Sequence, residues 1–560
     1  MTPGDGPAAP EGVPPETPSG VADAPEGTTG TFVHDTAVMS IGTALSRTTG
    51  FLRLAAMAYA LGITESRLAD AYNVANITPN IIYELALGGI LTSVVVPVLV
   101  QWLQLYGREE AWDVARRLFS FALVALAVVG FLGSLFAPWI VDLYTSGWSA
   151  TDRAEVHDLA TFFLRWFMPQ IVFYGVGAIA TGLLNAHRRF AAPMFAPILN
   201  NLIVIATFAA FAAMPDPSDG SLVSGAQRLV LAIGTTAGVV GMTLALLPAL
   251  RATGFRLAWR GGWRHEAVTR IAHLAKWVVV YVAANQLGYL VVIVLAGGIQ
   301  GGYTAYAAAF ILFQLPHSIF AVSIFTALLP AMSGRWAEGD IAGFREHLTR
   351  GIRATAAIVL PAALGYLVLA RPIVRLLLEH GVVTASSGRL VADLLVAFAV
   401  GLFPFSAFQL LLRAYYAMQD TRTPALVNLL ALAVNVTADL VLFFGFDLGV
   451  QGLALGHAAS YVVGSLALVV LMRRRLGGLD GRRVLEGIAR TIAAGAATAG
   501  ASWLVARVLA DAFGTATLGT QTIQVLGAVV AGLVVFLTAA TLLRIEEVAM
   551  VRRQLLARFR

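Results

Sequence analysis

Residues 119–141 read FSFALVALAVVGFLGSLFAPWIV, a stretch of 23 residues without a charged side chain. As an α-helix, a stretch of this length rises about 35 Å, enough to cross the hydrocarbon core of a bilayer. Apolar segments of 18 or more residues recur along the rest of the chain. Strands of an outer-membrane barrel would alternate apolar and polar residues over about 10 positions instead. The sequence therefore predicts an all-α integral membrane protein.

The predicted membrane segments are spread evenly, with seven in each half of the chain. They lie at about 36–62, 70–104, 116–145, 159–185, 191–214, 226–250 and 271–298, and then at about 303–334, 352–378, 389–417, 424–445, 450–473, 486–511 and 520–544. Together they predict about 14 transmembrane helices.

The composition supports this class. The chain has 560 residues, of which 58% are hydrophobic and 12% charged, whereas soluble domains carry about 25% charged residues. The net charge of +6 comes from short arginine clusters between apolar segments, which favours loops of a membrane protein over a nucleic-acid-binding surface. The absence of cysteine excludes disulfides and thiolate metal sites.

The distribution of arginine predicts the orientation. Loops after even-numbered segments are rich in arginine, as in the cluster 473–475, whereas loops after odd-numbered segments hold scattered residues such as Arg67 and Arg153. By the positive-inside rule, both termini face the cytoplasm of a multi-pass protein in a bacterial cytoplasmic membrane. The acidic segment 1–32 contains no arginine or lysine, so it lacks the basic start of a signal peptide and is expected to be disordered.

A weak internal repeat indicates two homologous lobes. Asn185 precedes Pro193 by the same interval that separates Tyr416 from Pro424, at the predicted ends of helices four and ten. The predicted units are an N-terminal lobe at 33–250, a C-terminal lobe at 251–475, an extra helix pair at 476–545 and a basic cytoplasmic tail at 546–560. Because six is an even number, two six-helix lobes would insert in the same orientation and form parallel repeats. Transporters built from such repeats bind substrate between them.

Two arginines stand inside the first predicted helix, in the segment SRTTGFLR that begins at Ser46. A charge at membrane depth is costly, so Arg47 and Arg53 require partners or water. Their spacing of six residues separates them by about 240° around the helix, which suits a wide cavity. Arg47 is predicted to lie deeper. The alternative is that both snorkel to the interface or pair with Asp70.

Proline interrupts two predicted helices. Pro79, followed by Asn80, breaks the second helix, and Pro316 breaks the eighth. Broken helices inside a membrane are tolerated where they line a cavity, although a packing kink without a ligand is the alternative. Asp70 stands near the start of the second helix, where it can contact substrate or cap the helix.

A polar pair stands in the eleventh predicted helix. Asn435 and Asp439 are four residues apart and share a helix face. They can bind a coupling cation or form a structural hydrogen bond between helices, and the sequence leaves both open. No histidine spacing indicates a metal site, and no nucleophile or phosphate-loop motif indicates an enzyme.

With these motifs, the chain resembles the MurJ (MviN) family of lipid II flippases, in the superfamily of MATE exporters and polysaccharide flippases. The resemblance covers about residues 36–545. It rests on Ser46-Arg47-x-x-Gly50-x-x-Arg53, Asp70-Ala71-Tyr72 with Pro79-Asn80, Leu184-Asn185 with Arg189-Phe190 through Pro197, and Gln419-Asp420-x-x-Thr423-Pro424. The sequence departs from the family pattern at Leu54, Tyr83, Glu84 and Gly88, and at Phe310 and Ile311, where an arginine of the eighth helix is missing.

The resemblance implies a transporter that flips the lipid-linked peptidoglycan precursor, lipid II, to the outer leaflet by alternating access during cell wall synthesis. It implies that the substrate-binding residues are Arg47, Arg53, Ser46, Asp70 and Asn80. No cofactor is expected, and sodium or the membrane potential is the expected energy source. The expected partners are lipid II, membrane lipids and proteins of cell wall synthesis or division, without nucleic acid.

Three other functions remain as alternatives. A flippase for another polyprenyl-diphosphate-linked glycan would recognise the same diphosphate. A MATE-like exporter of organic cations would place carboxylates, rather than arginines, in its cavity. A scaffold that recruits cell wall enzymes would need neither buried arginines nor broken helices.

Overall fold

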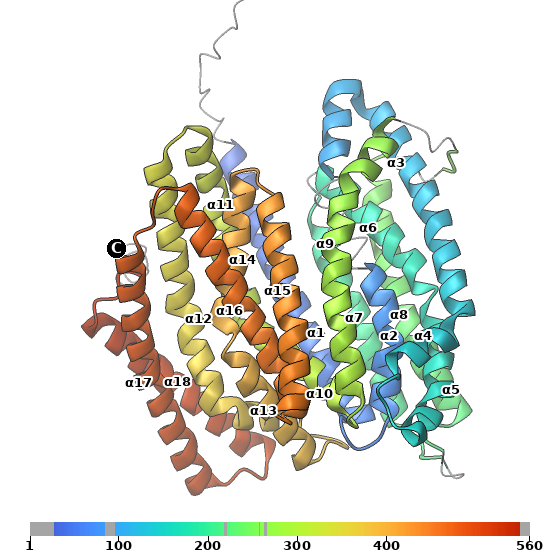
Figure 1. Cartoon of the computed structure of the whole chain (residues 1–560). Coiled ribbons are helices and arrows are strands. Elements are labelled where there is room, and N and C mark those ends of the chain that lie inside the picture. Colours follow the sequence, from blue (N-terminus) through green and yellow to red (C-terminus); the bar gives the residue numbers. More distant parts are fainter. Residues whose placement is uncertain are drawn as a thin grey trace, which may run out of the picture.

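The computed structural model describes residues 27–83, 96–187, 189–217, 221–256, 258–261 and 266–548. Within these residues the chain folds into α-helices, with two short π-helical segments and no β-strand. The all-α prediction is therefore confirmed for the described part of the chain. The helices run roughly side by side in two bundles (Figure 1).

The helices of the N-terminal half are α1 (Gly27–Leu61), α2 (Leu68–Tyr83), α3 (Val96–Leu135), α4 (Ala137–Tyr144), α5 (Ala150–Phe167), α6 (Gln170–Ala186), α7 (Ala191–Ala212), α8 (Gly225–Arg251) and α9 (Glu266–Gly297). Those that follow are α10 (Gly302–Pro316), η2 (His317–Ala321), α11 (Val322–Ala337), α12 (Ile341–Leu378), α13 (Ala385–Ala399), α14 (Leu402–Ala417), α15 (Arg422–Leu440), η3 (Val441–Gly445), α16 (Gly449–Arg475), α17 (Gly481–Phe513) and α18 (Leu518–Leu542).

Ten helices among the described residues are long and apolar enough to cross a membrane, or eleven if the bent pair α13 and α14 forms one span. These coincide with predicted segments. The other three predictions, 36–62, 70–104 and 271–298, include positions whose backbone or side chains lie outside the described set. The number of 14 transmembrane helices therefore stays a prediction.

The N-terminal helix begins earlier than the sequence predicted. Its backbone is helical from Gly27, whereas residues 1–32 were expected to be disordered. The apolar pattern marks only the part of a helix that faces lipid, and the backbone hydrogen bonds continue outward past it. The prediction for residues 1–26 lies outside the described residues.

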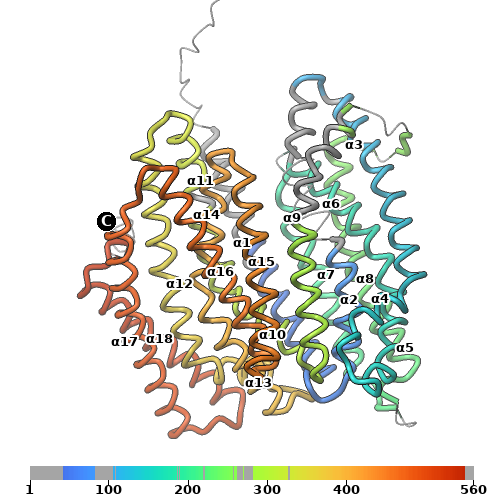
Figure 2. The backbone as a smooth tube through the Cα atoms, viewed as in Figure 1, coloured from blue at the N-terminus to red at the C-terminus, as the bar shows by residue number. Residues whose placement is uncertain are grey.

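The two bundles are joined by contacts of α9, and the division of the chain into two lobes stays a prediction. α1 packs along α7, and α9 contacts α3 and α4 as well as α10 and α15, so that α9 touches both bundles. The last two helices, α17 and α18, pack against each other and against α12 on the outer flank of the second bundle (Figures 1 and 2). The assignment of these two helices as a pair added to two repeats stays a prediction.

The two predicted proline breaks have different outcomes. At Pro316 the hydrogen-bond pattern changes to the π-helical turn η2, but the backbone stays helical from Gly302 to Ala337, so the predicted break is a local π-helical turn inside a continuous helix. At Pro79 the prediction is wrong, because α2 continues through the proline to Tyr83. The side-chain amide of Asn80 donates a 2.6 Å hydrogen bond to the Asn76 carbonyl, which helps to satisfy the backbone beside the proline.

Candidate functional site

A polar cavity of about 100 Å³ lies between the two bundles. Most of its wall comes from α1, α2, α6, α7 and α8, and α10 closes one side. It is lined by Gly50, Arg53, Leu54, Met57, Tyr72, Asn73, Asn76, Asn80, Gln170, Tyr174, Asn200, Val204, Phe208, Thr235, Val239, Ala307 and Ile311. Most of the polar groups in this wall are amides and hydroxyls, which bind uncharged polar ligands.

Three asparagines form a row along α2. Asn73, Asn76 and Asn80 are spaced by three and four residues, so they share one face of the helix. Asn73 donates to the hydroxyl of Thr304 at 3.1 Å, and Asn80 accepts from the hydroxyl of Tyr174 at 3.4 Å. The row thus presents hydrogen-bonding groups to the cavity along about two turns of helix.

Among the residues that the structure describes, Arg53 is the one charged side chain in the cavity wall. It is half-buried, and no carboxylate pairs with it among the described residues. Its charge acts on the buried Tyr72, whose hydroxyl lies 2.9 Å from that of Thr235. A guanidinium without a counterion in a half-buried cavity favours an anionic ligand.

Arg47 and Ser46 do not line this cavity. Arg47 is exposed, and its charge acts on His317 of η2 in the second bundle. Ser46 is half-buried, and its carbonyl accepts a 3.3 Å hydrogen bond from Asn201. The two arginines therefore project from different sides of α1, as the wide angular separation indicated. Arg53, rather than Arg47, has the enclosed position.

Asp70 lies outside the cavity as well, at the end where the bundles meet. Its side chain is fully buried. It accepts hydrogen bonds from Arg67 at 3.1 Å, from the backbone amide of Gly301 at 2.8 Å and from the Thr304 hydroxyl at 2.8 Å. In this conformation the carboxylate joins α2 to the start of α10 and is not available to a ligand.

Further contacts close the same end, which we call the closed end and which is the lower end in Figure 1. Arg67, 3% exposed, bonds Asp152 at 2.7 Å and stacks over Trp148 at 4.6 Å. Glu65 accepts from Thr384 at 2.8 Å and from Ser387. Burial raises the pKa of Glu65, but these hydrogen bonds and one from the Ile63 amide lower it below its usual value. The carboxylate therefore stays ionised and holds the bundles together.

Several residues of the site escaped the sequence analysis. The spacing of the asparagines on α2 was a readable signal, because a polar row at helical intervals inside an apolar segment indicates a cavity or a partner helix. Gln170, Asn200 and Thr235 carry no local signal, since each is a single polar residue on a separate helix.

The pair Asn435 and Asp439 lies on one face of α15, as predicted. Asn435 donates to Asp439 Oδ1 at 3.1 Å, a hydrogen bond within the helix rather than between helices. Asp439 is fully buried, and its Oδ2 has no hydrogen-bond partner in the described part of the chain. A Cβ at Gly456 of α16 would meet Asp439 Oδ1 at 2.1 Å, so the glycine makes room for the carboxylate. Cation binding by this pair stays a prediction.

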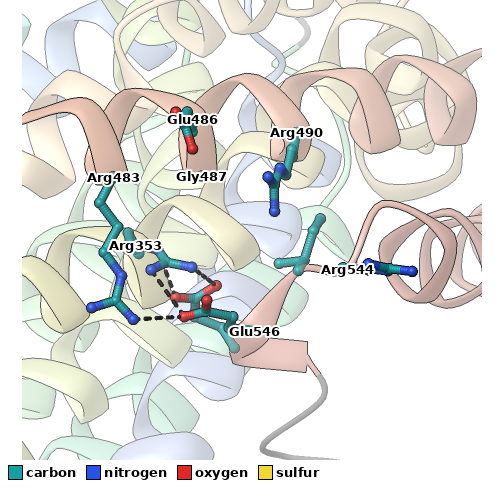
Figure 3. Close-up of a pocket in the computed structure, with 9 residues that line it drawn as sticks. Arg353, Arg483, Glu486, Gly487, Arg490, Arg544 and Glu546 are labelled. Carbon is teal, nitrogen blue, oxygen red and sulfur yellow. Dashed lines mark hydrogen bonds and ion pairs between the residues drawn. The ribbon is translucent and has the colours of Figure 1, made fainter.

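A pocket of about 250 Å³ lies on the outer flank of the second bundle, beside α12 and α17. The side chains that line it form several ion pairs (Figure 3). Arg353 of α12, 7% exposed, pairs with Glu546 at 3.1 Å and with Glu547 at 2.9 Å, and Arg483 of α17 bonds Glu546 at 3.0 Å. The hydrogen bond from Arg483 lowers the pKa of Glu546, although burial opposes it. A Cβ at Gly487 would meet Arg353 Nε at 2.9 Å. This cluster fastens the segment after α18 to two helices.

Comparison with known proteins identifies the family. The family model described as lipid II flippase MurJ matches residues 57–522. The chain belongs to the MurJ family. A probable lipid II flippase MurJ of Rhizobium meliloti (strain 1021) is 27% identical over 514 residues, which are 91% of this chain and 93% of that protein. The lipid II flippase MurJ of Burkholderia cenocepacia is 29% identical over 445 residues, which are 77% of this chain and 82% of that protein.

Solved structures show the same fold. A lipid II flippase MurJ in an inward closed conformation superposes with a TM-score of 0.72 and 20% identity, covering 90% of this chain and 98% of that MurJ chain. An inward-facing MATE-family multidrug transporter of the MOP superfamily superposes with a TM-score of 0.63 and 15% identity. The match covers 77% of this chain and 94% of the transporter chain. At these identities the structural likeness concerns the fold alone. It places the MurJ family and the MATE exporters on one architecture.

Proposed function

We propose that the chain flips lipid II from the inner to the outer leaflet of the cytoplasmic membrane by alternating access during cell wall synthesis. The single observation that supports this most directly is the guanidinium of Arg53, which has no carboxylate partner among the described residues and lies in a cavity lined in part by amides, between two bundles closed at one end. Family membership supplies the substrate class.

The chemistry of the cavity suits this substrate. The head group of lipid II combines a diphosphate with a disaccharide and a peptide, and it is too polar to cross hydrocarbon unaided. Arginine binds phosphate oxygens through a planar fork. The amide row on α2 can exchange hydrogen bonds with sugar hydroxyls and peptide groups. The polyprenyl tail stays in lipid along the apolar flank of α17 and α18, where Val530, Leu533 and Val534 are exposed.

The conformation suits the first half of a transport cycle. The arginine-rich loops predicted to face the cytoplasm lie at the end opposite the closed end. The bundles are therefore joined on the proposed periplasmic side, and the substrate is loaded from the cytoplasmic side. Rocking of the bundles then requires the contacts of Glu65, Arg67 and Asp70 to break. Contacts with proteins of cell wall synthesis or division are a further expectation from the family.

The cavity argues against the alternative of a cation exporter. A MATE-like site for organic cations needs carboxylates, and the charged group in this wall is an arginine. A flippase for another polyprenyl-diphosphate glycan shares the diphosphate chemistry, so the substrate assay must separate the two.

The proposal is tested by reconstitution. The purified chain in liposomes is expected to expose fluorescent lipid II on the outer leaflet, and its gene is expected to rescue a bacterium depleted of its own lipid II flippase. Lipid-linked glycans without the peptide serve as competing substrates. Absence of lipid II flipping together with movement of another glycan lipid would overturn the assignment.

The orientation is a prediction with a direct test, because the chain contains no cysteine. A single cysteine at position 262, in the arginine-rich loop 251–270, is expected to resist an impermeant thiol reagent in intact spheroplasts. Ala516→Cys, in the opposite loop 512–519, is expected to react. The periplasmic placement of residues 146–153 follows from the same rule. Labelling in the reverse pattern would invert the topology.

Energy coupling gives a further prediction. We propose that Asn435 and Asp439 bind sodium through a carboxylate and an amide oxygen, with further oxygens completing the shell. Sodium, compared with potassium at equal ionic strength, is then expected to raise the melting temperature of the wild-type chain. Asp439→Asn is expected to remove most of that rise, whereas the exposed Asp158→Asn keeps it. If the wild type melts equally in both salts, the pair is structural and the membrane potential becomes the energy source to test.

A further inference from the structure

Arg413 is a half-buried arginine on α14, in the C-terminal bundle. Its Nε is buried and has no hydrogen-bond partner among the described residues. Its guanidinium carbon lies 5.5 Å above the ring of Phe325 on α11. No ion pair to a carboxylate is formed by Arg413 within the described residues. Cation–π stacking offsets only part of the cost of removing a guanidinium from water, so Arg413 is a candidate for binding a ligand.

The surroundings of Arg413 point to one place in the fold. Ser406 precedes Arg413 by seven residues, about two helical turns, so both face the same neighbours. The Ser406 hydroxyl lies 3.0 Å from Nδ1 of His317, and the His317 ring lies 5.8 Å from that of Phe325. His317 opens the π-helical turn η2, and such turns occur often at functional sites.

Arg47 of α1 acts electrostatically on the same histidine. The positive charges of Arg413 and Arg47 both act on the ring of His317. Arg47 belongs to a helix that packs on α7 in the first bundle, whereas Arg413 belongs to the second. The charges of two guanidinium groups from different bundles therefore act on one histidine, and neither group has a carboxylate partner in the described structure. Like charges repel, so this arrangement favours an anion between them.

We propose that Arg413 binds the diphosphate of the lipid-linked substrate together with Arg47, from the opposite bundle. This inference rests on the proposed function and extends it to a residue of the C-terminal lobe. A diphosphate offers several oxygens over two phosphorus centres, so it can accept bonds from both guanidinium groups at once. Binding then links the two bundles through the substrate, which gives a physical route from substrate loading to rocking of the bundles.

The test measures binding by the purified full-length chain in nanodiscs. The probe is undecaprenyl diphosphate, which has the diphosphate and the tail but neither sugar nor peptide. Arg413→Ala is expected to weaken its binding about 10- to 100-fold, the effect of losing a charge-assisted bond. Arg413→Lys keeps the charge without the planar fork and is expected to fall between Ala and the wild type.

Three controls separate ligand binding from other roles. Arg422→Ala removes an exposed arginine nine residues further on and is expected to leave affinity unchanged. Phe325→Leu removes the ring but keeps the cation, so retained binding supports a direct role of the guanidinium. Competition by the soluble disaccharide-pentapeptide without diphosphate tests the peptide carboxylate as the anion. If Arg413→Ala weakens that competitor instead of undecaprenyl diphosphate, the diphosphate assignment is overturned.

Failure of this inference and failure of the proposed function give different results. Affinity of Arg413→Ala within twofold of the wild type overturns the role of Arg413, while lipid II flipping by the wild type remains intact. Absence of flipping by the wild type removes the proposed function itself. Melting temperatures of each variant show whether a loss of binding reflects unfolding, and Arg413→Lys supplies the folded comparison if Ala does not fold.

Discussion

Replacing both Arg47 and Arg53 with alanine is expected to abolish lipid II flipping while leaving a folded, membrane-inserted protein. Arg53 provides the charge in the cavity, and the charge of Arg47 acts on His317. Each charge-assisted bond to phosphate contributes about 1.5–3 kcal/mol, or about 10- to 150-fold in affinity. Loss of both therefore removes several orders of magnitude of substrate binding.

Folding should survive these changes because neither arginine pairs with a carboxylate in the described part of the chain. Removing the half-buried guanidinium of Arg53 also relieves a desolvation cost. Of the single variants, Arg53→Ala is expected to be the more severe, since Arg53 lines the cavity and Arg47 is exposed. The sequence alone had suggested the opposite order from the estimated depth along the helix.

Growth of a flippase-depleted strain, with membrane levels checked by immunoblot, measures the outcome. Lysine variants provide the matched comparison, because they keep the charge and lose the bidentate geometry. If both arginines merely snorkel to the interface, lysine is fully tolerated and alanine is mild. Full growth of the double alanine variant would remove the cationic mechanism altogether.

Much of the fold was predictable because its signals are local. Long apolar segments set the helices, and Pro316 marks a π-helical turn inside the eighth predicted helix, although the backbone stays helical there. The prediction of a break at Pro79 was wrong because the side-chain amide of Asn80 donates a hydrogen bond to the Asn76 carbonyl. This bond helps to satisfy the backbone beside the proline, so the helix can continue. The start of the first helix was missed for the opposite reason, since its first residues carry no apolar pattern.

The site was only partly predictable because it is assembled from distant parts of the chain. Arg53 and Asn80 were identified and do share a cavity. Asp70 was grouped with them, but its partners Gly301 and Thr304 lie more than 200 residues away and place it at the closed end. Arg413 could have been found by the rule applied to Arg47, since it also interrupts an apolar segment.

The closed end offers a second test with a large expected effect. Asp70 is fully buried and accepts three hydrogen bonds, two of them across the bundle interface. Replacing it with asparagine keeps the size but removes the charge and turns an NH₂ group toward donors. Hydrogen bonds to charged groups contribute about 1.5–3 kcal/mol each, so the closed arrangement should lose stability relative to the open one.

The result can be measured by cross-linking across the closed end. The hydroxyls of Thr64 and Ser387, from the two bundles, lie 2.5 Å apart, and the chain has no native cysteine. Cysteines at these two positions are expected to form a disulfide readily in the otherwise wild-type chain. Asp70→Asn is expected to slow that reaction about tenfold or more and to impair flipping, because the bundles no longer rest closed at this end.

The matched control is Asp158→Asn on α5, because the Asp158 side chain is 97% exposed. This variant should change neither the cross-linking rate nor flipping. If Asp70→Asn cross-links at the wild-type rate but flipping is lost, Asp70 acts on the substrate, as the sequence first suggested, and not through closure.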